Sequence, residues 1–229
     1  MKTSIFRLMF ALPLLLSMNQ SYAQAASNPP PARSILITGF EPFGATTGHV
    51  AQFTNNSEEV ANLMMRSFAK YLPNIHLEVC ILPIEYDWAA VVLQSCLNKM
   101  KIPADRILSL GELNTPFIRV EKFAHNLDNE PRGADAKGVV RQNQTIAPGA
   151  PMEIALTGFP ISDMLSRVAA ADRPHIQPSQ EMQAYVCNNT AYRVALALDG
   201  RIPFLFMHVP DSGAPSEFAR IILSTGFWL

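Results

Sequence analysis

The sequence predicts an α/β fold, a single three-layer α/β/α domain with a twisted mixed, mostly parallel central sheet. Short runs of β-branched and apolar residues alternate along the chain with longer segments whose apolar residues recur at helical spacing. The run 203–209 is almost entirely apolar, which is typical of a strand buried on both faces. Strands that alternate with helices indicate a sheet covered by helices on both sides.

The first expected strand, 34–38, stops at Gly39, which indicates a turn at the end of a buried strand. Capping residues at 55–58 then begin a helix whose apolar positions continue to Tyr71. The other expected strands lie at 76–82, 105–110 and 203–209, and the other expected helices at 86–100, 160–171, 188–198 and 217–223. Each strand is a short apolar run, and each helix repeats its apolar residues every three or four positions. The segment 123–149, rich in Asn, Asp, Gly and Gln, predicts an extended excursion or a small hairpin.

The first 25 residues are expected to be an export signal. A basic start precedes an apolar run at 8–18, and small residues allow cleavage near Ala23 or Ala25. This run is about half of the roughly 20 apolar residues that a membrane span needs. We therefore expect an exported protein, periplasmic or secreted, with no membrane span after cleavage. The proline-rich segment 26–33 is then a linker, and 34–229 is the folded domain.

Composition excludes some classes of function. The chain has 18 Lys and Arg against 19 Asp and Glu, a net charge of −1, which excludes a dedicated nucleic-acid binder. With 48% hydrophobic and 16% charged residues, the chain has enough apolar residues for a sizeable core. Three cysteines leave at least one thiol unpaired in a monomer. We expect Cys80 and Cys96 to be buried free thiols, although export makes their pairing possible.

Three residues supply the parts of a nucleophilic hydrolase. Cys187 directly precedes a predicted helix, whose amino terminus favours a thiolate, and His208 ends an apolar strand. Glu121 follows a strand-like pattern, where its simplest interpretation is a solvated carboxylate paired with Arg119 or Lys122. Cys187 and His208 also have simpler interpretations, as a small buried side chain and a core histidine. Because their spacing is a poor metal signature, we expect no metal and no cofactor.

Four motifs occur in the order and rough spacing of one known family. They are Thr38-Gly-Phe-Glu-Pro-Phe-Gly44, Ala147-Pro-Gly-Ala-Pro151, Tyr185-Val-Cys-Asn188 and His208-Val-Pro210. Together they make most of the chain resemble the type I pyroglutamyl peptidases, the cysteine peptidases also called pyrrolidone carboxyl peptidases. The resemblance implies an α/β/α fold and a triad with Cys187 as nucleophile, His208 as base and Glu121 as orienting carboxylate. Glu121 stands in a segment, Ile118-Arg-Val-Glu121-Lys122, similar to the family's I-x-x-E-R.

The resemblance implies hydrolysis of an amino-terminal pyroglutamyl residue from a peptide, through a thioester. The lactam ring is uncharged with two apolar faces, so its pocket should be aromatic. The residues expected to line that pocket are Phe40, Phe43, Tyr185, Val186 and Glu112. Glu112 lies in a turn that departs from the family's G-x-x-G-R, which puts the specificity in question.

The peptide substrate is the expected partner, and the family resemblance also leaves a homo-oligomer open. The alternative function is an exported non-catalytic or altered-specificity member of the same fold that binds blocked peptide amino termini. Release of a fluorophore from a pyroglutamyl amide distinguishes the two, because a binder does not turn it over.

Overall fold

The computed structural model describes residues 33–43, 54–71, 74–130, 133–156, 158–180 and 182–228. The expected export signal, its cleavage site and all of the expected linker except Arg33 lie outside the described residues. Among the described residues, no helix is both long and apolar enough to span a membrane.

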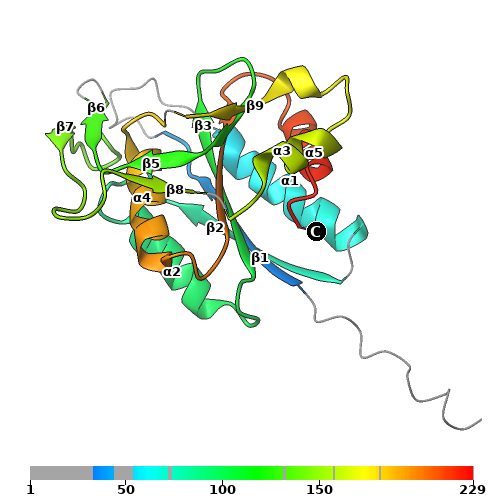
Figure 1. Cartoon of the computed structure of the whole chain (residues 1–229), viewed down its shortest axis with the longest axis horizontal. Helices are drawn as coiled ribbons and strands as arrows, with labels where there is room; N and C mark the ends of the chain where they lie inside the picture. Colours follow the sequence, from blue (N-terminus) through cyan, green and yellow to red (C-terminus); the bar gives the residue numbers. More distant parts are fainter. Residues whose placement is uncertain are drawn as a thin grey trace, which may run out of the picture. The chain divides into compact units, whose positions relative to one another are not determined.

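A six-stranded sheet forms the centre of the fold (Figure 1). Its strands lie in the order β2 (Ile75–Leu82), β1 (Arg33–Phe40), β3 (Arg106–Leu113), β10 (Phe204–Pro210), β4 (Ile118–Glu121) and β9 (Ile176–Ser179). Neighbouring strands pair in parallel except β10 and β4, which are antiparallel. The prediction of a mixed, mostly parallel sheet is therefore confirmed.

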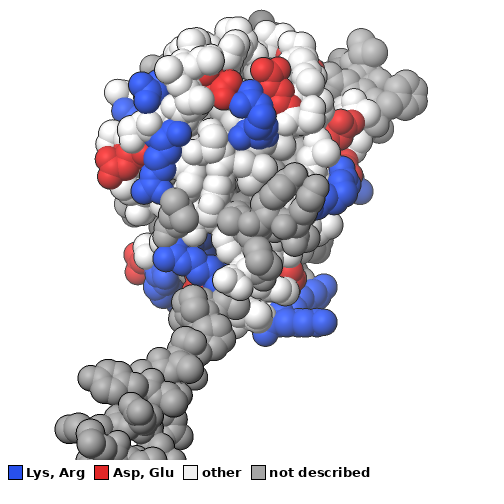
Figure 2. All heavy atoms as spheres, turned by 90° about the vertical axis from the view of Figure 1, so that its right-hand side faces the viewer, with Lys and Arg blue, Asp and Glu red and all other residues white. Residues whose placement is uncertain are grey.

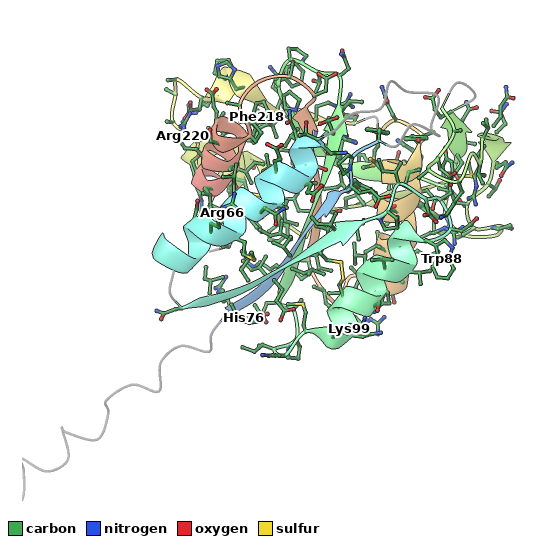
Figure 3. The ribbon with its side chains drawn as sticks, turned by 180° about the vertical axis from the view of Figure 1, so that it is seen from behind. Arg66, His76, Trp88, Lys99, Phe218 and Arg220 are labelled. Atoms are coloured by element: carbon green, nitrogen blue, oxygen red, sulfur yellow. A yellow bond between two sulfur atoms is a disulfide. The ribbon has the colours of Figure 1, made fainter. Side chains whose placement is uncertain are left out.

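Helices cover both faces of this sheet, as Figure 1 shows. The helices α1 (Asn56–Tyr71), α3 (Ile161–Arg167) and α5 (Pro215–Ser224) lie on one face, and α2 (Ala89–Lys99) and α4 (Val186–Leu198) on the other. Figure 3 shows the same division from behind, with Arg66 on α1 and Arg220 on α5 well away from Trp88, the N-cap residue of α2. This confirms the three-layer architecture.

The side-chain alternation of the strands assigns residues to these two layers. On β10, Leu205, Met207 and Val209 pack in the core cluster under α1 and α5. Phe204 and Phe206 pack in the other cluster, beneath α2 and α4. His208 therefore belongs to the face that α4 covers.

The segment expected to be an excursion forms two small sheets beside the main one. One pairs β5 (Phe123–His125) with β8 (Glu153–Ala155), and the other pairs β6 (Asp128–Glu130) with β7 (Arg141–Gln144). Both are antiparallel, and β5 and β8 contact α4.

One strand was not predicted. The helix expected at 160–171 ends at Arg167, and β9 follows after a 3-10 turn at Arg173–His175. β9 contains Pro178, which has no N–H to donate and argues against a central strand. In the sheet order β9 is an edge strand that pairs only with β4, where a proline is tolerated.

The expectation of free thiols at Cys80 and Cys96 is wrong, because these two residues form a disulfide with their Cα atoms 6.3 Å apart. Cys80 lies on β2 and Cys96 on α2, and these two elements pack against each other. A separation of 16 residues in the sequence does not reveal which face of α2 meets β2. The remaining cysteine, Cys187, is free.

The surface carries both signs of charge. Figure 2 shows basic and acidic side chains interspersed on one face, separated by wide uncharged areas. This mixture agrees with the near balance of charge in the sequence.

Candidate active site

His208 and Glu121 lie side by side on neighbouring strands. In the antiparallel pair of β10 and β4, His208 is opposite Arg119 and Phe206 is opposite Glu121. Glu121 and His208 are therefore diagonal neighbours on one face of the sheet. His208 Nδ1 lies 2.8 Å from Glu121 Oε1, and the two side chains are only 2% and 0% exposed. Because an ionised carboxylate only accepts hydrogen bonds, Nδ1 carries the proton and Nε2 is left as the basic nitrogen.

Cys187 lies in the first turn of α4, which begins at Val186 with Tyr185 as its N-cap residue. The sequence placed the helix one residue after Cys187, so the helix starts earlier than expected. The first N–H groups of a helix have no partner within the helix, and they are therefore available to a substrate oxygen.

Gly111 brings the thiol and the imidazole together. It lies on β3 directly opposite His208 on β10. A Cβ atom placed on Gly111 would lie 3.0 Å from Cys187 Sγ and 3.1 Å from His208 Nε2. The sulfur and the basic nitrogen thus border the same small space, which exists because residue 111 has no side chain. The sequence marked Gly111 only as the start of an altered turn.

The simplest interpretation of Glu121 from the sequence, a solvated carboxylate, is wrong. It is fully buried, and its Oε1 also lies 3.1 Å from Arg119 Nε. Its other oxygen, Oε2, is buried with no hydrogen-bond partner among the described residues. Of the two cations considered from the sequence, Arg119 is the one that forms an ion pair with Glu121.

The environment of Cys187 favours the thiol. Burial, and then the negative charges of Glu121 and Glu112, raise the pKa of Cys187 from 9.0 to about 12, against a small lowering by its own backbone N–H. The expectation that the helix amino terminus yields a thiolate is therefore wrong for the resting site. The ring nitrogen that borders the sulfur is His208 Nε2.

All five residues expected to line the substrate pocket surround one cavity beside Cys187. The cavity wall consists of Phe40, Phe43, Asn55, Ile84, Glu112, Tyr185, Val186 and Cys187. It is largely aromatic and aliphatic, with one carboxylate. We call it the ring pocket.

Glu112 is held at the rim of this pocket by the start of α1. The backbone N–H of Asn56, the first residue of α1, donates to Glu112 Oε2 at 2.6 Å. Burial raises the pKa of Glu112, whereas this hydrogen bond lowers it, and Asp211 and Glu59 add repulsion. Glu112 thus caps a helix and faces the ring pocket at the same time.

A second cavity of about 250 Å³ opens next to the ring pocket, and we call it the outer pocket. The two share Phe43, Glu112 and Tyr185. The other residues that line the outer pocket are Leu113, Asn114, Glu130, Gln183 and Asp211. Leu113 and Asp211 continue β3 and β10 beyond Gly111 and His208.

Two residues that sequence reasoning did not place in the site support the helix that carries Cys187. Asn188 Oδ1 accepts the N–H of His125 at 2.8 Å, and its Nδ2 donates to the carbonyls of His125 and Leu127. Asn189 Nδ2 donates to Asp128 at 2.7 Å. Two consecutive asparagines directly after a cysteine are the sequence signal that could have identified them.

Tyr185 is fixed from two sides. Its hydroxyl donates to the carbonyl of Ala134 at 2.7 Å, and its ring packs edge-on against Tyr86 with centroids 5.6 Å apart. The guanidinium of Arg141 lies over the far ring, 4.6 Å from the Tyr86 centroid. Tyr185, one residue of the ring-pocket wall, is thus held by both a hydrogen bond and ring packing.

No group of three or more His, Cys, Asp or Glu side chains that could hold a metal ion occurs in the described part of the chain. A thiol in the first turn of a helix, an imidazole near the carboxyl end of β10 and a buried carboxylate on the neighbouring antiparallel strand β4 form the arrangement that cysteine hydrolases use.

Comparison with known proteins places this arrangement in one family. The sequence model of the pyroglutamyl peptidase family matches residues 33–217. The chain therefore belongs to the pyroglutamyl peptidase family.

Individual relatives agree with this assignment. A pyrrolidone-carboxylate peptidase of Lacticaseibacillus paracasei is 29% identical over 182 residues, which cover 77% of each chain. One of Yersinia pestis is 27% identical over 203 residues, which cover 83% of this chain and 88% of that protein.

Solved structures share the fold. The pyrrolidone carboxyl peptidase of Thermus thermophilus superposes with a TM-score of 0.69 at 24% identity, covering 83% of this chain and 97% of that one. Pyroglutamyl peptidase I of Bacillus amyloliquefaciens gives a TM-score of 0.71 at 21% identity, covering 84% of this chain and 92% of that one.

Proposed function

We propose that this protein removes an amino-terminal pyroglutamyl residue from peptides, with Cys187 as nucleophile, His208 as general base and acid, and Glu121 as orienting carboxylate. The observation that carries the proposal is the space above Gly111, which Cys187 Sγ and His208 Nε2 border together, at the edge of the ring pocket. Membership of the family supports the substrate.

The ring pocket suits a lactam. Phe40 and Phe43 supply apolar surface for the two faces of the ring, and Val186 and Tyr185 close the pocket beside the sulfur. A charged amine loses its hydration in such a place, and Glu112 at the rim is already engaged with the Asn56 N–H. An uncharged pyroglutamyl end therefore fits better than a free amino terminus.

The first chemical step forms a tetrahedral intermediate on the way to the thioester. His208 Nε2 takes the proton of the Cys187 thiol as the sulfur attacks the carbonyl that joins the lactam to the next residue. The N–H groups in the first turn of α4 donate to the oxygen as negative charge develops on it. The protonated imidazole is stabilised by its hydrogen bond to Glu121.

The second step completes the thioester. His208 gives its proton to the leaving amine, the carbon–nitrogen bond breaks, and the shortened peptide departs through the outer pocket. In the third step His208 takes a proton from water, and the resulting hydroxide attacks the thioester. The carbon–sulfur bond then breaks, His208 returns the proton to the sulfur, and free pyroglutamate leaves.

Release of a fluorophore from a pyroglutamyl amide tests this proposal, with wild type compared with Cys187→Ser and with Gln94→Ala, at an exposed position of α2, as a control. We expect turnover by wild type and the control under reducing conditions, and loss of at least about 1,000-fold in Cys187→Ser. Equal turnover by Cys187→Ser contradicts the assignment of the nucleophile.

A binding measurement, read together with the turnover assay, addresses the alternative, a non-catalytic member that binds blocked amino termini. Calorimetry with a pyroglutamyl peptide measures binding to Cys187→Ser, whose pocket is intact. Binding without any turnover by wild type favours the alternative, whereas turnover by wild type rejects it.

We also propose that the protein is exported, with residues 1–25 as a cleaved signal, and works in the periplasm or outside the cell. The paired state of Cys80 and Cys96 supports this, because structural disulfides persist in oxidising compartments. Fractionation of the producing cells and sequencing of the mature amino terminus test it. A cytosolic, uncleaved chain would contradict it.

A further inference from the structure

A guanidinium lies directly behind the carboxylate of the proposed triad. Arg119 precedes Glu121 by two residues on β4, so the alternation of the strand puts both side chains on one face. Arg119 Nε is 3.1 Å from Glu121 Oε1, the same oxygen that His208 Nδ1 approaches at 2.8 Å. The cation and the imidazole therefore share one acceptor atom.

This ion pair is weakly screened. Glu121 is fully buried and the Arg119 side chain is only 20% exposed. A buried carboxylate without a counter-charge is costly, and an arginine cannot lose its proton to escape the pairing. The pair with Arg119 thus supplies the counter-charge of the buried carboxylate that accepts from His208.

The guanidinium is also anchored on its far side. Arg119 Nη2 donates to Ser179 Oγ on β9, and Ser179 lies opposite Glu121 in the parallel pair of β4 and β9. A planar group held at two edges has one orientation, which in turn fixes the orientation of the carboxylate.

The negative charge of Glu121 opposes the thiolate that the reaction needs. It is one of the causes that raise the pKa of Cys187, after burial and ahead of Glu112. The charged or titratable groups that face the sulfur are Glu121 from β4, Glu112 from β3 and His208 from β10, with Tyr185 beside it at the start of α4. Among the described residues, the arginine or lysine that forms an ion pair with one of these groups is Arg119, and its partner is Glu121.

We infer that Arg119 is a positioning residue, which holds Glu121 against His208 and offsets its charge so that the reactive thiolate forms at a lower pH. This role rests on the proposed function, because it concerns the same Cys187, His208 and Glu121. Arg119 is then a fourth residue of the site, beside the three of the proposed triad. Removal of Arg119 should therefore change the pH at which Cys187 reacts. Removal of an arginine far from the site should leave that pH unchanged.

Alkylation of Cys187 tests the inference without any need for turnover. The full chain is treated with iodoacetamide across a range of pH, and the rate of modification of Cys187 is followed by peptide mass spectrometry. The variants are Arg119→Gln, Arg119→Lys and the control Arg66→Gln, which removes an exposed arginine from α1 on the other face of the sheet (Figure 3).

Removing the positive charge of Arg119 makes it harder for the Cys187 thiol to lose its proton. We therefore expect the midpoint pH of alkylation to rise by about one unit or more in Arg119→Gln. It should stay at the wild-type value in Arg66→Gln and lie closer to wild type in Arg119→Lys. An unchanged midpoint in Arg119→Gln overturns the inference.

Arg119→Lys gives a second test that survives if Arg119→Gln fails to fold. Lysine keeps the charge but loses the planar fork, so we expect kcat for a pyroglutamyl amide to fall at least about fivefold with KM within twofold of wild type. Wild-type kcat in Arg119→Lys overturns the positioning role. If wild type shows no turnover while the alkylation midpoint still shifts, the proposed function fails and the electrostatic inference stands.

Discussion

His208 Nδ1 approaches Glu121 Oε1 at 2.8 Å from the neighbouring antiparallel strand. Neither residue reaches solvent to any extent, so the hydrogen bond is protected from competing water. It turns the basic Nε2 of the ring toward the space that Cys187 Sγ also borders. The pairing of β10 with β4 thus decides the tautomer of the imidazole.

Glu121→Gln should test this relationship. A glutamine amide can donate to Nδ1, which moves the proton to Nε2 and removes the base. We expect kcat for a pyroglutamyl amide to fall by about 1,000-fold to 10,000-fold, with little change in KM. The matched control is Glu153→Gln, which touches only the half-exposed pair with His125. A fall of less than tenfold would contradict the role of Glu121.

Gly111→Ala should disable the site while leaving the sheet in place. The new methyl group would lie 2.9 Å from His208 Cδ2 and 3.0 Å from Cys187 Sγ, closer than carbon and sulfur atoms pack. Displacement of either group by even about 1 Å costs on the order of 100-fold in rate. Gly158→Ala is the control, because its Cβ meets Pro203 at an ordinary 3.4 Å. Steady-state kinetics and circular dichroism on both variants provide the measurements.

The alkaline stability of the protein should depend on Cys187. Its pKa is 9.0 when exposed and about 12 in the folded protein, so the unfolded chain loses this proton first as the pH rises. Stability contributed by the protonated thiol is complete below pH 9 and declines above it, by about 1.4 kcal/mol per pH unit. We expect the free energy of unfolding in urea to fall less steeply between pH 9 and 11 in Cys187→Ala. Parallel slopes in the two proteins would contradict the burial of this thiol.

The charge of the outer pocket should influence which peptides are cleaved. Glu112 and Asp211 both line it, so a cationic side chain after the pyroglutamyl residue meets favourable potential. We expect kcat/KM to be about threefold to tenfold higher for a pyroglutamyl-lysyl peptide than for a pyroglutamyl-glutamyl peptide at low ionic strength.

Asp211→Asn should reduce this preference, and Asp199→Asn, at the far end of α4, should leave it unchanged. Added salt should weaken it as well. A preference for the acidic peptide, or none at low salt, would show that the outer pocket does not receive the second residue.

The layers of the fold could be predicted because alternation and helical spacing are local properties of the sequence. The apolar run that became β10 indicated a buried strand, and the whole of β10 is buried in the structure. By contrast, β9 could not be predicted, because a strand that contains Pro178 is acceptable only at an edge, and edges depend on the order of the whole sheet.

The residues expected at the site were brought together, but two of its features depend on contacts between distant strands. Gly111 leaves space for the thiol and the imidazole because β3 and β10 pair in the register that puts it opposite His208. The protonated state of Cys187 follows from burial and from carboxylates on β3 and β4, which outweigh the local effect of the helix amino terminus. Neither register nor burial can be read from the spacing of residues along the chain.

The disulfide between Cys80 and Cys96 leaves Cys187 without any other cysteine in the chain to react with. Peroxide would convert the Cys187 thiolate to a sulfenic acid, and no neighbouring thiol of the same molecule can condense with it. Recovery then depends on a small thiol or a reductase supplied from outside. In the oxidising compartment proposed for this protein, that dependence would limit the working life of each molecule.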